Sequence, residues 1–234
     1  MTTLLKKIRA RAGNGIQTVL SSAGWELRRR SERHTTPMTL EALSGFLYFV
    51  RRFAEIRLLQ GDIVECGVGR GKSFLCLAFL AAEENAGRML WGFDSFAGFP
   101  DPTPEDKSPR NPQQGEKISK KEDVVWMLRD AHLGDDFVKN YVRFVPGFFN
   151  DTLPHYTGNN IALLHIDGDL YRSYKDTLDT LYSRVVPGGL ILFDEYNTVQ
   201  FPGATKAVNE FFSGKGVEIK HDRLSEKYYC VKPQ

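Results

Sequence analysis

The sequence has few cysteines and no long uncharged apolar run. Its three cysteines, Cys66, Cys76 and Cys230, lack the spacing of a metal site. We interpret them as buried free thiols in a reducing compartment. No stretch reaches the roughly 18 uncharged apolar residues of a membrane span. Charges interrupt the apolar stretch at the N-terminus, which argues against a cleavable signal peptide. A cytoplasmic protein without a transmembrane span is therefore expected.

The composition is that of one ordinary globular domain. Hydrophobic residues make up 41% and charged residues 26% of the 234 residues. This length is sufficient for one α/β domain with a full core and short for two. We find neither an internal repeat nor a long low-complexity tract.

The net charge of +2 is distributed unevenly along the chain. Residues 1–35 carry eight Lys/Arg and two Glu, a balance of +6, and the remaining residues carry 23 Lys/Arg and 27 Asp/Glu, a balance of −4. We interpret residues 1–38 as a basic, solvated extension, with weak contact to a membrane surface as the alternative. The extension lacks the interleaved aromatic residues that stack on bases, so no nucleic-acid partner is expected.

The pattern of residues 39–234 predicts a single α/β domain with a helical extension at its N-terminus. Residues 39–59 suit a helix that begins after Thr39 as N-cap. Short apolar runs predict strands, and longer amphipathic segments between them predict helices. The expected strands are 61–67, 88–94, 141–145, 161–167, 189–194, 217–220 and 227–232, and the expected helices between them are 72–82, 123–131, 173–184 and 205–212. This alternation predicts a Rossmann-like, mostly parallel seven-stranded sheet with helices on both faces.

Residues 101–122 interrupt this alternation. They contain four prolines, ten charged residues and a single large apolar residue, Ile118. Such a segment cannot bury enough apolar surface to order itself alone. A loop of this length inside a compact domain is usually a disordered insert or an active-site lid. Because it follows the second expected strand, we interpret it as a lid.

The stretch ECGVGRGKSF, which begins at Glu65, resembles two phosphate-binding turns but fits neither. A P-loop would need glycine where Cys66 stands. The dinucleotide fingerprint is G-x-G-x-x-G, and the spacing here is G-x-G-x-G. Glu65, at the mouth of the first strand, would also repel a polyphosphate. These mismatches argue against an NTPase and a dinucleotide enzyme.

S-adenosylmethionine fits the same turn better. Glu65 suits its ammonium group, and the amides that open the helix at Lys72, together with the Ser73 hydroxyl, suit its carboxylate. Asp94 ends the second expected strand, where a carboxylate binds a ribose diol. Three glycines let the chain pass close to such a ligand: Gly67, Gly69 and Gly71.

A second group of polar residues follows the fourth and fifth expected strands. Asp167 and Asp169 follow one strand, and Asp194 and Glu195 follow the other. Ligands of open α/β sheets bind at these carboxyl ends, so the acids are expected to converge. Clustered carboxylates repel unless an oxygen-preferring cation neutralises them, and Mg²⁺ is the most available. The alternatives are that Asp169 caps a helix and that Glu195 faces solvent. His165 is more often a core residue than a base.

Six motifs in order resemble the macrocin O-methyltransferase family over residues 61–213. They are ECGVGRGKS, FDSFAGFPD, VPGFFNDTLP, LLHIDGDLYRSYKDTLDTLY, PGGLILFDEY and FPGATKAVNEFF. The resemblance implies a class I methyltransferase fold. It also implies S-adenosylmethionine and a divalent metal, usually Mg²⁺, as cofactors for methylation of hydroxyls, often on sugars of natural products.

The resemblance also assigns roles to individual residues. Asp167 would be a metal ligand and the candidate base, with Asp169 or His165 as the alternative base. Asp194 and Glu195 would be the other ligands, although the family commonly has DDY where this chain has DEY, so the third ligand is a methylene longer. The expected cofactor site comprises Glu65, Gly67, Gly69, Gly71, Ser73, Asp94, Ser95 and Phe149.

The sequence thus predicts an S-adenosylmethionine-dependent O-methyltransferase. Its expected acceptor is a hydroxyl of a small molecule or glycan, such as a sugar on a natural product, and a homo-oligomer is expected. The alternatives are a non-catalytic scaffold that keeps the cofactor site and, less favoured, an NTPase.

Overall fold

The computed structural model describes residues 39–234. The basic extension expected at 1–38, and its membrane-surface contact, lie outside these described residues. The chain divides into two units, Met1–Thr39 and Leu40–Gln234, and all elements described below belong to the second. Within the described part of the chain, no helix is both long and apolar enough to cross a bilayer.

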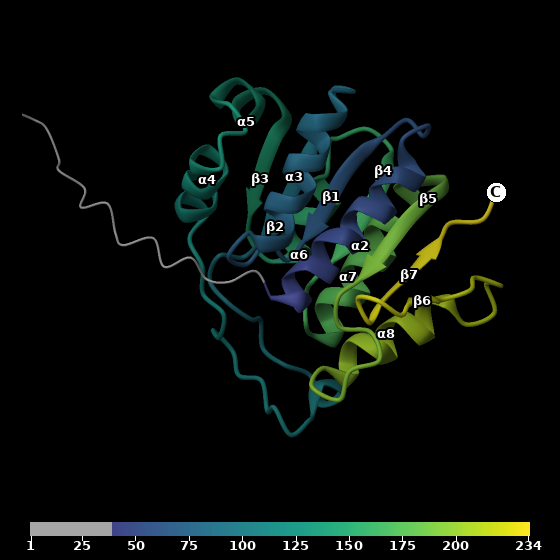
Figure 1. Ribbon diagram of the computed structural model, residues 1–234. Helices are drawn as coiled ribbons and strands as arrows, with labels where there is room; N and C mark the ends of the chain where they lie inside the picture. Colours follow the sequence, from purple (N-terminus) through teal and green to yellow (C-terminus); the bar gives the residue numbers. More distant parts are fainter. Residues whose placement is uncertain (1–38) are drawn as a thin grey trace, which may run out of the picture. The chain divides into compact units, whose positions relative to one another are not determined.

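A seven-stranded sheet forms the centre of Leu40–Gln234 (Figure 1), in the order β3-β2-β1-β4-β5-β7-β6. Its strands are β1 (Asp62–Cys66), β2 (Leu90–Asp94), β3 (Val142–Pro146), β4 (Ile161–Ile166), β5 (Val185–Phe193), β6 (Lys220–Asp222) and β7 (Lys227–Val231). The pairings among β1 to β5 are parallel, and β7 pairs antiparallel with both β5 and β6. The expected mostly parallel sheet is confirmed, and β4 and β5 are neighbours, as convergence of the acids requires.

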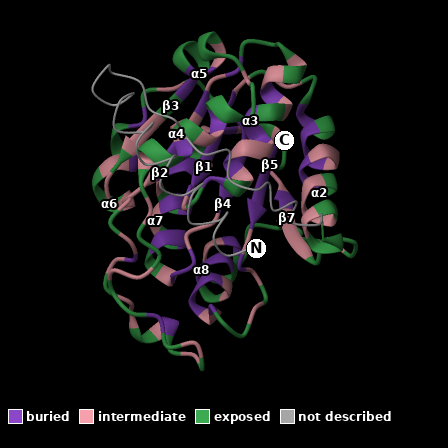
Figure 2. Cartoon of the chain, turned by 60° about the vertical axis from the view of Figure 1, so that its left-hand side comes forward, coloured by how far each residue is buried: buried purple, intermediate pink, exposed green. Residues whose placement is uncertain are grey.

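Helices cover both faces of this sheet and bury two hydrophobic clusters against it (Figures 1 and 2). The helices are α2 (Leu40–Ile56), α3 (Lys72–Glu84), α4 (Lys121–Asp130), α5 (Asp135–Tyr141), α6 (Phe149–Thr152), α7 (Tyr171–Leu181) and α8 (Pro202–Phe212). One cluster joins α2, α3, α4 and α5 to strand residues such as Ile63 and Leu163. The other joins α7 and α8 to the alternate residues, such as Val64 and Leu164. Successive strand side chains point to opposite faces of the sheet, and each face is covered by one of these clusters. β1 is therefore buried along its whole length.

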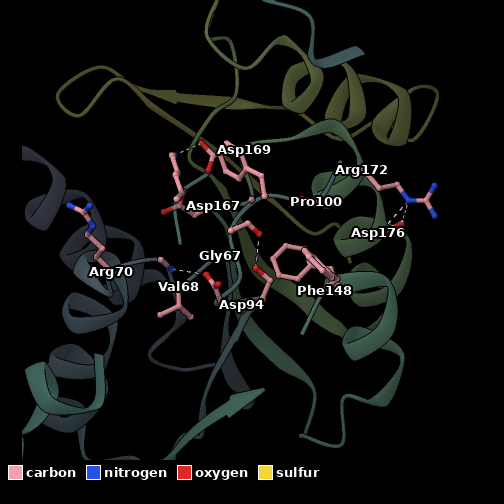
Figure 3. Close-up of a pocket in the computed structure, with 18 of the residues that line it drawn as sticks. Gly67, Val68, Arg70, Asp94, Pro100, Phe148, Asp167, Asp169, Arg172 and Asp176 are labelled. Carbon is pink, nitrogen blue, oxygen red and sulfur yellow. Dashed lines mark hydrogen bonds and ion pairs between the residues drawn. The ribbon is translucent and has the colours of Figure 1, made fainter. Parts of the chain in front are cut away.

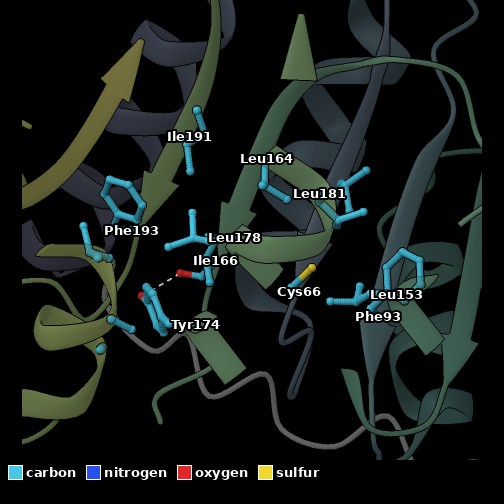
Figure 4. Close-up of a cluster of buried hydrophobic side chains, with 14 of the residues drawn as sticks. Cys66, Phe93, Leu153, Leu164, Ile166, Tyr174, Leu178, Leu181, Ile191 and Phe193 are labelled. Atoms are coloured by element: carbon cyan, nitrogen blue, oxygen red, sulfur yellow. Dashed lines mark hydrogen bonds between the residues drawn. The ribbon is translucent and has the colours of Figure 1, made fainter. Parts of the chain in front are cut away.

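Tyr174 of α7 connects the second cluster to the acidic end of the sheet (Figure 4). Its ring is fully buried beside Leu178 and strand residues. Its hydroxyl lies 2.9 Å from the carbonyl oxygen of Ile166 and 2.8 Å from Oε2 of Glu195. It also accepts a hydrogen bond of 3.1 Å from the Glu195 amide. A core residue thus fixes Glu195 where β5 ends.

Some expected boundaries are wrong. Tyr141, expected to open the third strand, ends α5, a helix that we did not expect. The rings of Phe137 and Tyr141 lie 5.7 Å apart, an i,i+4 contact typical of a helix. β5 begins at Val185, ahead of the expected 189, and an irregularity between Val185 and Leu190 takes up its extra residues opposite Ile161 and Leu163 of β4. β6 lies at Lys220–Asp222 rather than 217–220, and a 3₁₀ turn, Tyr182–Arg184, follows α7.

Residues 101–122 are held by polar contacts rather than by a core of their own. The Phe99 amide donates to the carbonyl of Glu116 (2.8 Å), and the Gly115 amide donates to the carbonyl of Phe99 (3.0 Å). These bonds close a neck at the base of the segment. Between them lies a 3₁₀ turn, Pro104–Asp106, that ends at the buried carboxylate of Asp106.

Asp106 anchors the segment on the first turn of α7. Its Oδ1 accepts a 2.7 Å bond from the amide of Tyr171, and its Oδ2 accepts from the amide and hydroxyl of Thr103 at 2.8 and 2.9 Å. A carboxylate is favourable at a helix N-terminus. Gly203 of α8 leaves room for it, since a Cβ there would lie 2.1 Å from Oδ1 of Asp106.

Removing this carboxylate should loosen the segment. We expect Asp106→Ala to lower the free energy of unfolding by about 1–2 kcal/mol, because the Tyr171 and Thr103 amides lose their acceptor. Urea denaturation measures the change. Asp101→Ala, an exposed carboxylate of the same segment, is the matched control and should leave stability within about 0.5 kcal/mol. Equal stabilities of the two variants would show that Asp106 does not anchor the segment.

Candidate active site

A cavity of about 480 Å³ opens at the carboxyl ends of β1, β2 and β4 (Figure 3). Its walls come from the turn between β1 and α3, the end of β2, the neck of the 101–122 segment, the start of α6 and the turn between β4 and α7. Open α/β sheets bind their ligands at this edge. The cavity is therefore the candidate active site.

The glycine turn after β1 is shaped by a close approach to the end of β4. Gly67 has φ +101°, and a Cβ at this position would lie 1.8 Å from the carbonyl oxygen of Asp167. Only glycine fits there. The next glycine, Gly69, has φ +52° and open space around its Cβ position. Its amide donates a 2.7 Å hydrogen bond to Oδ2 of Asp94, so the end of β2 holds the turn in place.

Most of the predicted cofactor residues line this cavity: Gly67, Gly69, Ser73, Asp94, Ser95 and Phe149. Asp94 also accepts a 2.6 Å hydrogen bond from the amide of Phe96. Its carboxylate is thus oriented by two backbone amides at the cavity wall. The neighbouring Phe148, absent from the predicted set, lines the cavity as well.

Two predicted cofactor residues, Gly71 and Glu65, lie elsewhere. Gly71 has φ +82° at the start of α3, and a Cβ there would meet the side chains of Met127 and Val124 of α4 at 2.7 and 2.8 Å. It therefore serves packing between helices. Glu65 is fully buried, and its Oε1 lies 2.7 Å from Nδ1 of His165. Neither residue lines the cavity, and their contact with a cofactor stays a prediction.

The three acids predicted as metal ligands do converge. Carboxylate oxygens of Asp167, Asp194 and Glu195 all lie within 4.8 Å of one another. The Asp194 amide donates to the carbonyl of Ile166 (3.0 Å), which ties the end of β5 to that of β4. The alternative that Glu195 faces solvent is wrong, because it is 6% exposed. Of the three, Asp167 lines the cavity.

The electrostatics of this cluster suit a cation. Burial, and then the charge of Asp194, raise the pKa of Asp167 to about 8. Burial and both aspartates likewise raise the pKa of Glu195. Burial opposes ionisation of Asp194, but the ammonium of Lys227 on β7, in ion-pair contact, and then His165 lower its pKa overall. One ammonium does not compensate three clustered carboxylates. An all-oxygen donor set of this kind fits Mg²⁺ or a similar hard divalent cation.

Asp169 is paired with a residue that the sequence did not single out. Lys117, just beyond the neck of the 101–122 segment, places Nζ 2.6 Å from Oδ1 of Asp169, and both residues line the cavity. The same ammonium lies 5.4 and 5.1 Å from the ring centroids of Phe99 and Phe201. The alternative that Asp169 caps the next helix is wrong, because the Tyr171 amide bonds to Asp106 instead.

The strand order, the glycine turn after β1 and the carboxylate that ends β2 define a class I methyltransferase fold. Residues 51–226 match the family model described as Macrocin-O-methyltransferase (TylF). The chain belongs to this family, as the six motifs predict.

Relatives and a solved structure agree with this assignment. The chain is 35% identical over 158 residues to a demethyldecarbamoylnovobiocin O-methyltransferase of Streptomyces niveus, a match that covers 65% of this chain and 58% of the relative. It is 38% identical over 144 residues to the 8-demethyl-8-(2,3-dimethoxy-alpha-L-rhamnosyl)-tetracenomycin-C 4'-O-methyltransferase of Streptomyces olivaceus, covering 59% of this chain and 54% of the relative. These matches thus span less than two thirds of either relative. The structure of the O-methyltransferase NovP is similar with a TM-score of 0.70 and 28% identity, over 82% of this chain and 81% of that one.

Proposed function

We propose that this protein is an S-adenosylmethionine-dependent O-methyltransferase that methylates a sugar hydroxyl of a natural product or glycan with the help of a divalent cation. The observation that carries the proposal is one cavity with two chemically different walls. The glycine turn and Asp94 form one wall, and Asp167 and Asp169 lie on the other. The name of the rhamnosyl-tetracenomycin relative supports a sugar hydroxyl as acceptor.

The first wall suits the cofactor. S-adenosylmethionine would supply the electrophilic methyl group on its sulfonium. Asp94 would accept hydrogen bonds from the ribose diol, and Ser73 at the start of α3 would bind the methionine carboxylate. Gly67 and Gly69 would let the backbone approach the ligand closely. These groups are held before binding, since the Gly69 amide already bonds to Asp94.

The second wall suits a hydroxyl that must lose its proton. Asp167, Asp194 and Glu195 would hold a divalent cation, whose Lewis acidity lowers the pKa of a nearby hydroxyl. Asp167 or Asp169, which both line the cavity, would accept the proton. His165 lies outside the cavity lining, with Nδ1 paired to Glu65. The walls together would align the acceptor oxygen with the methyl group, and this alignment supplies much of the acceleration.

Metal removal tests the proposal. We expect EDTA to lower methyl transfer to glycosylated acceptors by about 10²-fold or more, and Mg²⁺ to restore it, because the carboxylates would otherwise lack a Lewis acid. The measurement is transfer of a labelled methyl group, alongside calorimetric titration with S-adenosylmethionine. Absence of cofactor binding would overturn the proposed function. Transfer that EDTA leaves unchanged would overturn the metal alone, and ATP hydrolysis would favour the NTPase alternative.

A further inference from the structure

A buried pair, Glu65 and His165, lies behind the cavity and is not used by the proposed chemistry. Glu65 on β1 and His165 on β4 are register partners across the parallel ladder. They are 0% and 1% exposed, and Nδ1 of His165 lies 2.7 Å from Oε1 of Glu65. The ring of Phe49 on α2 packs edge-on against the imidazole, with centroids 5.2 Å apart. The pair is therefore fixed in one arrangement.

Each member of the pair also neighbours one wall of the cavity. On the cofactor side, Glu65 lies on β1 two residues before Gly67, and the amide of Asp167 donates a 2.9 Å hydrogen bond to the carbonyl of Cys66 between them. Gly67 itself lines the cavity. On the acidic side, ligand-type atoms of Glu65, His165 and Asp167 all lie within 4.8 Å of one another. The pair thus stands between the glycine turn of the cofactor wall and the predicted metal ligand Asp167.

An unsatisfied atom indicates that this arrangement serves more than packing. Oε2 of Glu65 is buried and has no hydrogen-bond partner among the described residues. A buried carboxylate oxygen without a partner costs stability. Apolar residues in place of a buried ionic pair are often neutral or stabilising, so packing alone does not require Glu65 or His165.

We propose that Glu65 and His165 are positioning residues that couple the two halves of the site. The pair orients the glycine turn through Glu65 and Asp167 through His165, so that a cation on the acidic side and S-adenosylmethionine on the other bind more tightly together than alone. Residues behind metal ligands commonly tune metal affinity by 10–100-fold, and coupling between two ligands is reciprocal. The proposal rests on the proposed function and gives Glu65 an indirect role in place of direct cofactor contact.

The test is calorimetric titration of the full chain. S-adenosylmethionine is titrated with and without saturating Mg²⁺, and Mg²⁺ is titrated with and without saturating cofactor. In the wild-type protein we expect each ligand to lower the Kd of the other by about tenfold. In His165→Phe, which keeps a ring against Phe49, this factor should fall to about one, and Mg²⁺ affinity should fall by about 10-fold or more. His165→Gln, which keeps a hydrogen-bonding side chain, should restore part of the factor.

Two further variants make the result decisive. The double variant Glu65→Leu, His165→Phe replaces the whole pair by apolar side chains and is expected to fold, as thermal unfolding will show. It should lose the coupling like the single variant. Ser73→Ala, the matched control, should weaken cofactor binding but leave Mg²⁺ affinity in the absence of cofactor unchanged. Unchanged coupling and Mg²⁺ affinity in the folded double variant would overturn the inference while the proposed function stands. Failure of the wild-type protein to bind S-adenosylmethionine would instead overturn the proposed function.

Discussion

Asp167→Asn is expected to lower methyl transfer by about 10²–10⁴-fold, the range typical of a lost general base. Asp167 is the one member of its acidic cluster that lines the cavity, and it lies within 4.8 Å of Asp194 and Glu195. Asparagine has the same shape but neither the charge that attracts a cation nor the basicity to accept a proton. The measurement is the rate of labelled methyl transfer at saturating cofactor and acceptor.

The variant should lose activity without losing its fold. The pKa of Asp167 is raised from 3.8 to about 8 by burial and then by Asp194. Between pH 3.8 and about pH 8, Asp167 of the folded, metal-free protein keeps a proton that Asp167 of the unfolded chain releases. The free energy of unfolding therefore falls as the pH rises through this window, and Asp167→Asn should weaken that dependence, to which the raised pKa of Glu195 also contributes. Wild-type rates in a folded variant would exclude Asp167 as both ligand and base.

Asp169→Asn serves as the companion variant. Asp169 lines the same cavity but is paired with Lys117 rather than with the acidic cluster. If Asp167 is the base, Asp169→Asn should lower the rate by much less and leave Mg²⁺ affinity unchanged. If Asp169→Asn lowers the rate as strongly while Mg²⁺ still binds, Asp169 is the base and Asp167 is a ligand only.

Gly67→Ala is expected to destabilise the protein by about 3 kcal/mol or more, which is large for a single methyl group. The new Cβ would stand 1.8 Å from the carbonyl oxygen and 2.5 Å from the carbonyl carbon of Asp167. Both contacts are with backbone, so no side-chain rotation relieves them. Either the turn after β1 or the end of β4 must move, and both carry cavity walls. Urea denaturation and cofactor titration should therefore both show the change.

Gly69→Ala is the matched control for this prediction. It lies in the same turn, also has positive φ (+52°), and has no atom within 4 Å of its Cβ position. It should lower the free energy of unfolding by only about 1–2 kcal/mol, the cost of a left-handed conformation in an L-residue. Equal effects of the two substitutions would show that backbone conformation, and not the contact with Asp167, determines the requirement for glycine.

The sequence predicted the parts of the site that depend on strand ends. The carboxyl ends of parallel strands meet at one edge, so apolar runs that end at Asp94, Asp167 and Asp194 were sufficient to place these carboxylates at the same edge of the sheet. The same reasoning placed Gly67 and Gly69 at the cavity. It did not show that Gly71 packs against α4 and that Glu65 is buried beside His165, because residue spacing does not reveal which face of a strand or helix a side chain occupies.

The remaining contacts depend on tertiary packing that residue patterns do not show. Lys227 reaches Asp194 from the antiparallel strand β7, and Lys117 reaches Asp169 from a segment without periodicity. His165 and Glu65 stand 100 residues apart and meet only through the β1–β4 register. No local signal distinguishes these partners from solvated charges.

The closed neck of the 101–122 segment bears on how the length of this segment could vary. Its ends are bonded through Phe99 and Glu116, and Asp106 fixes one side to α7. Residues 107–114 do not line the cavity, and lengthening such a loop adds little closure entropy. Insertions that spare Arg110, which pairs with Glu116 at the neck, would therefore leave the cavity walls in place.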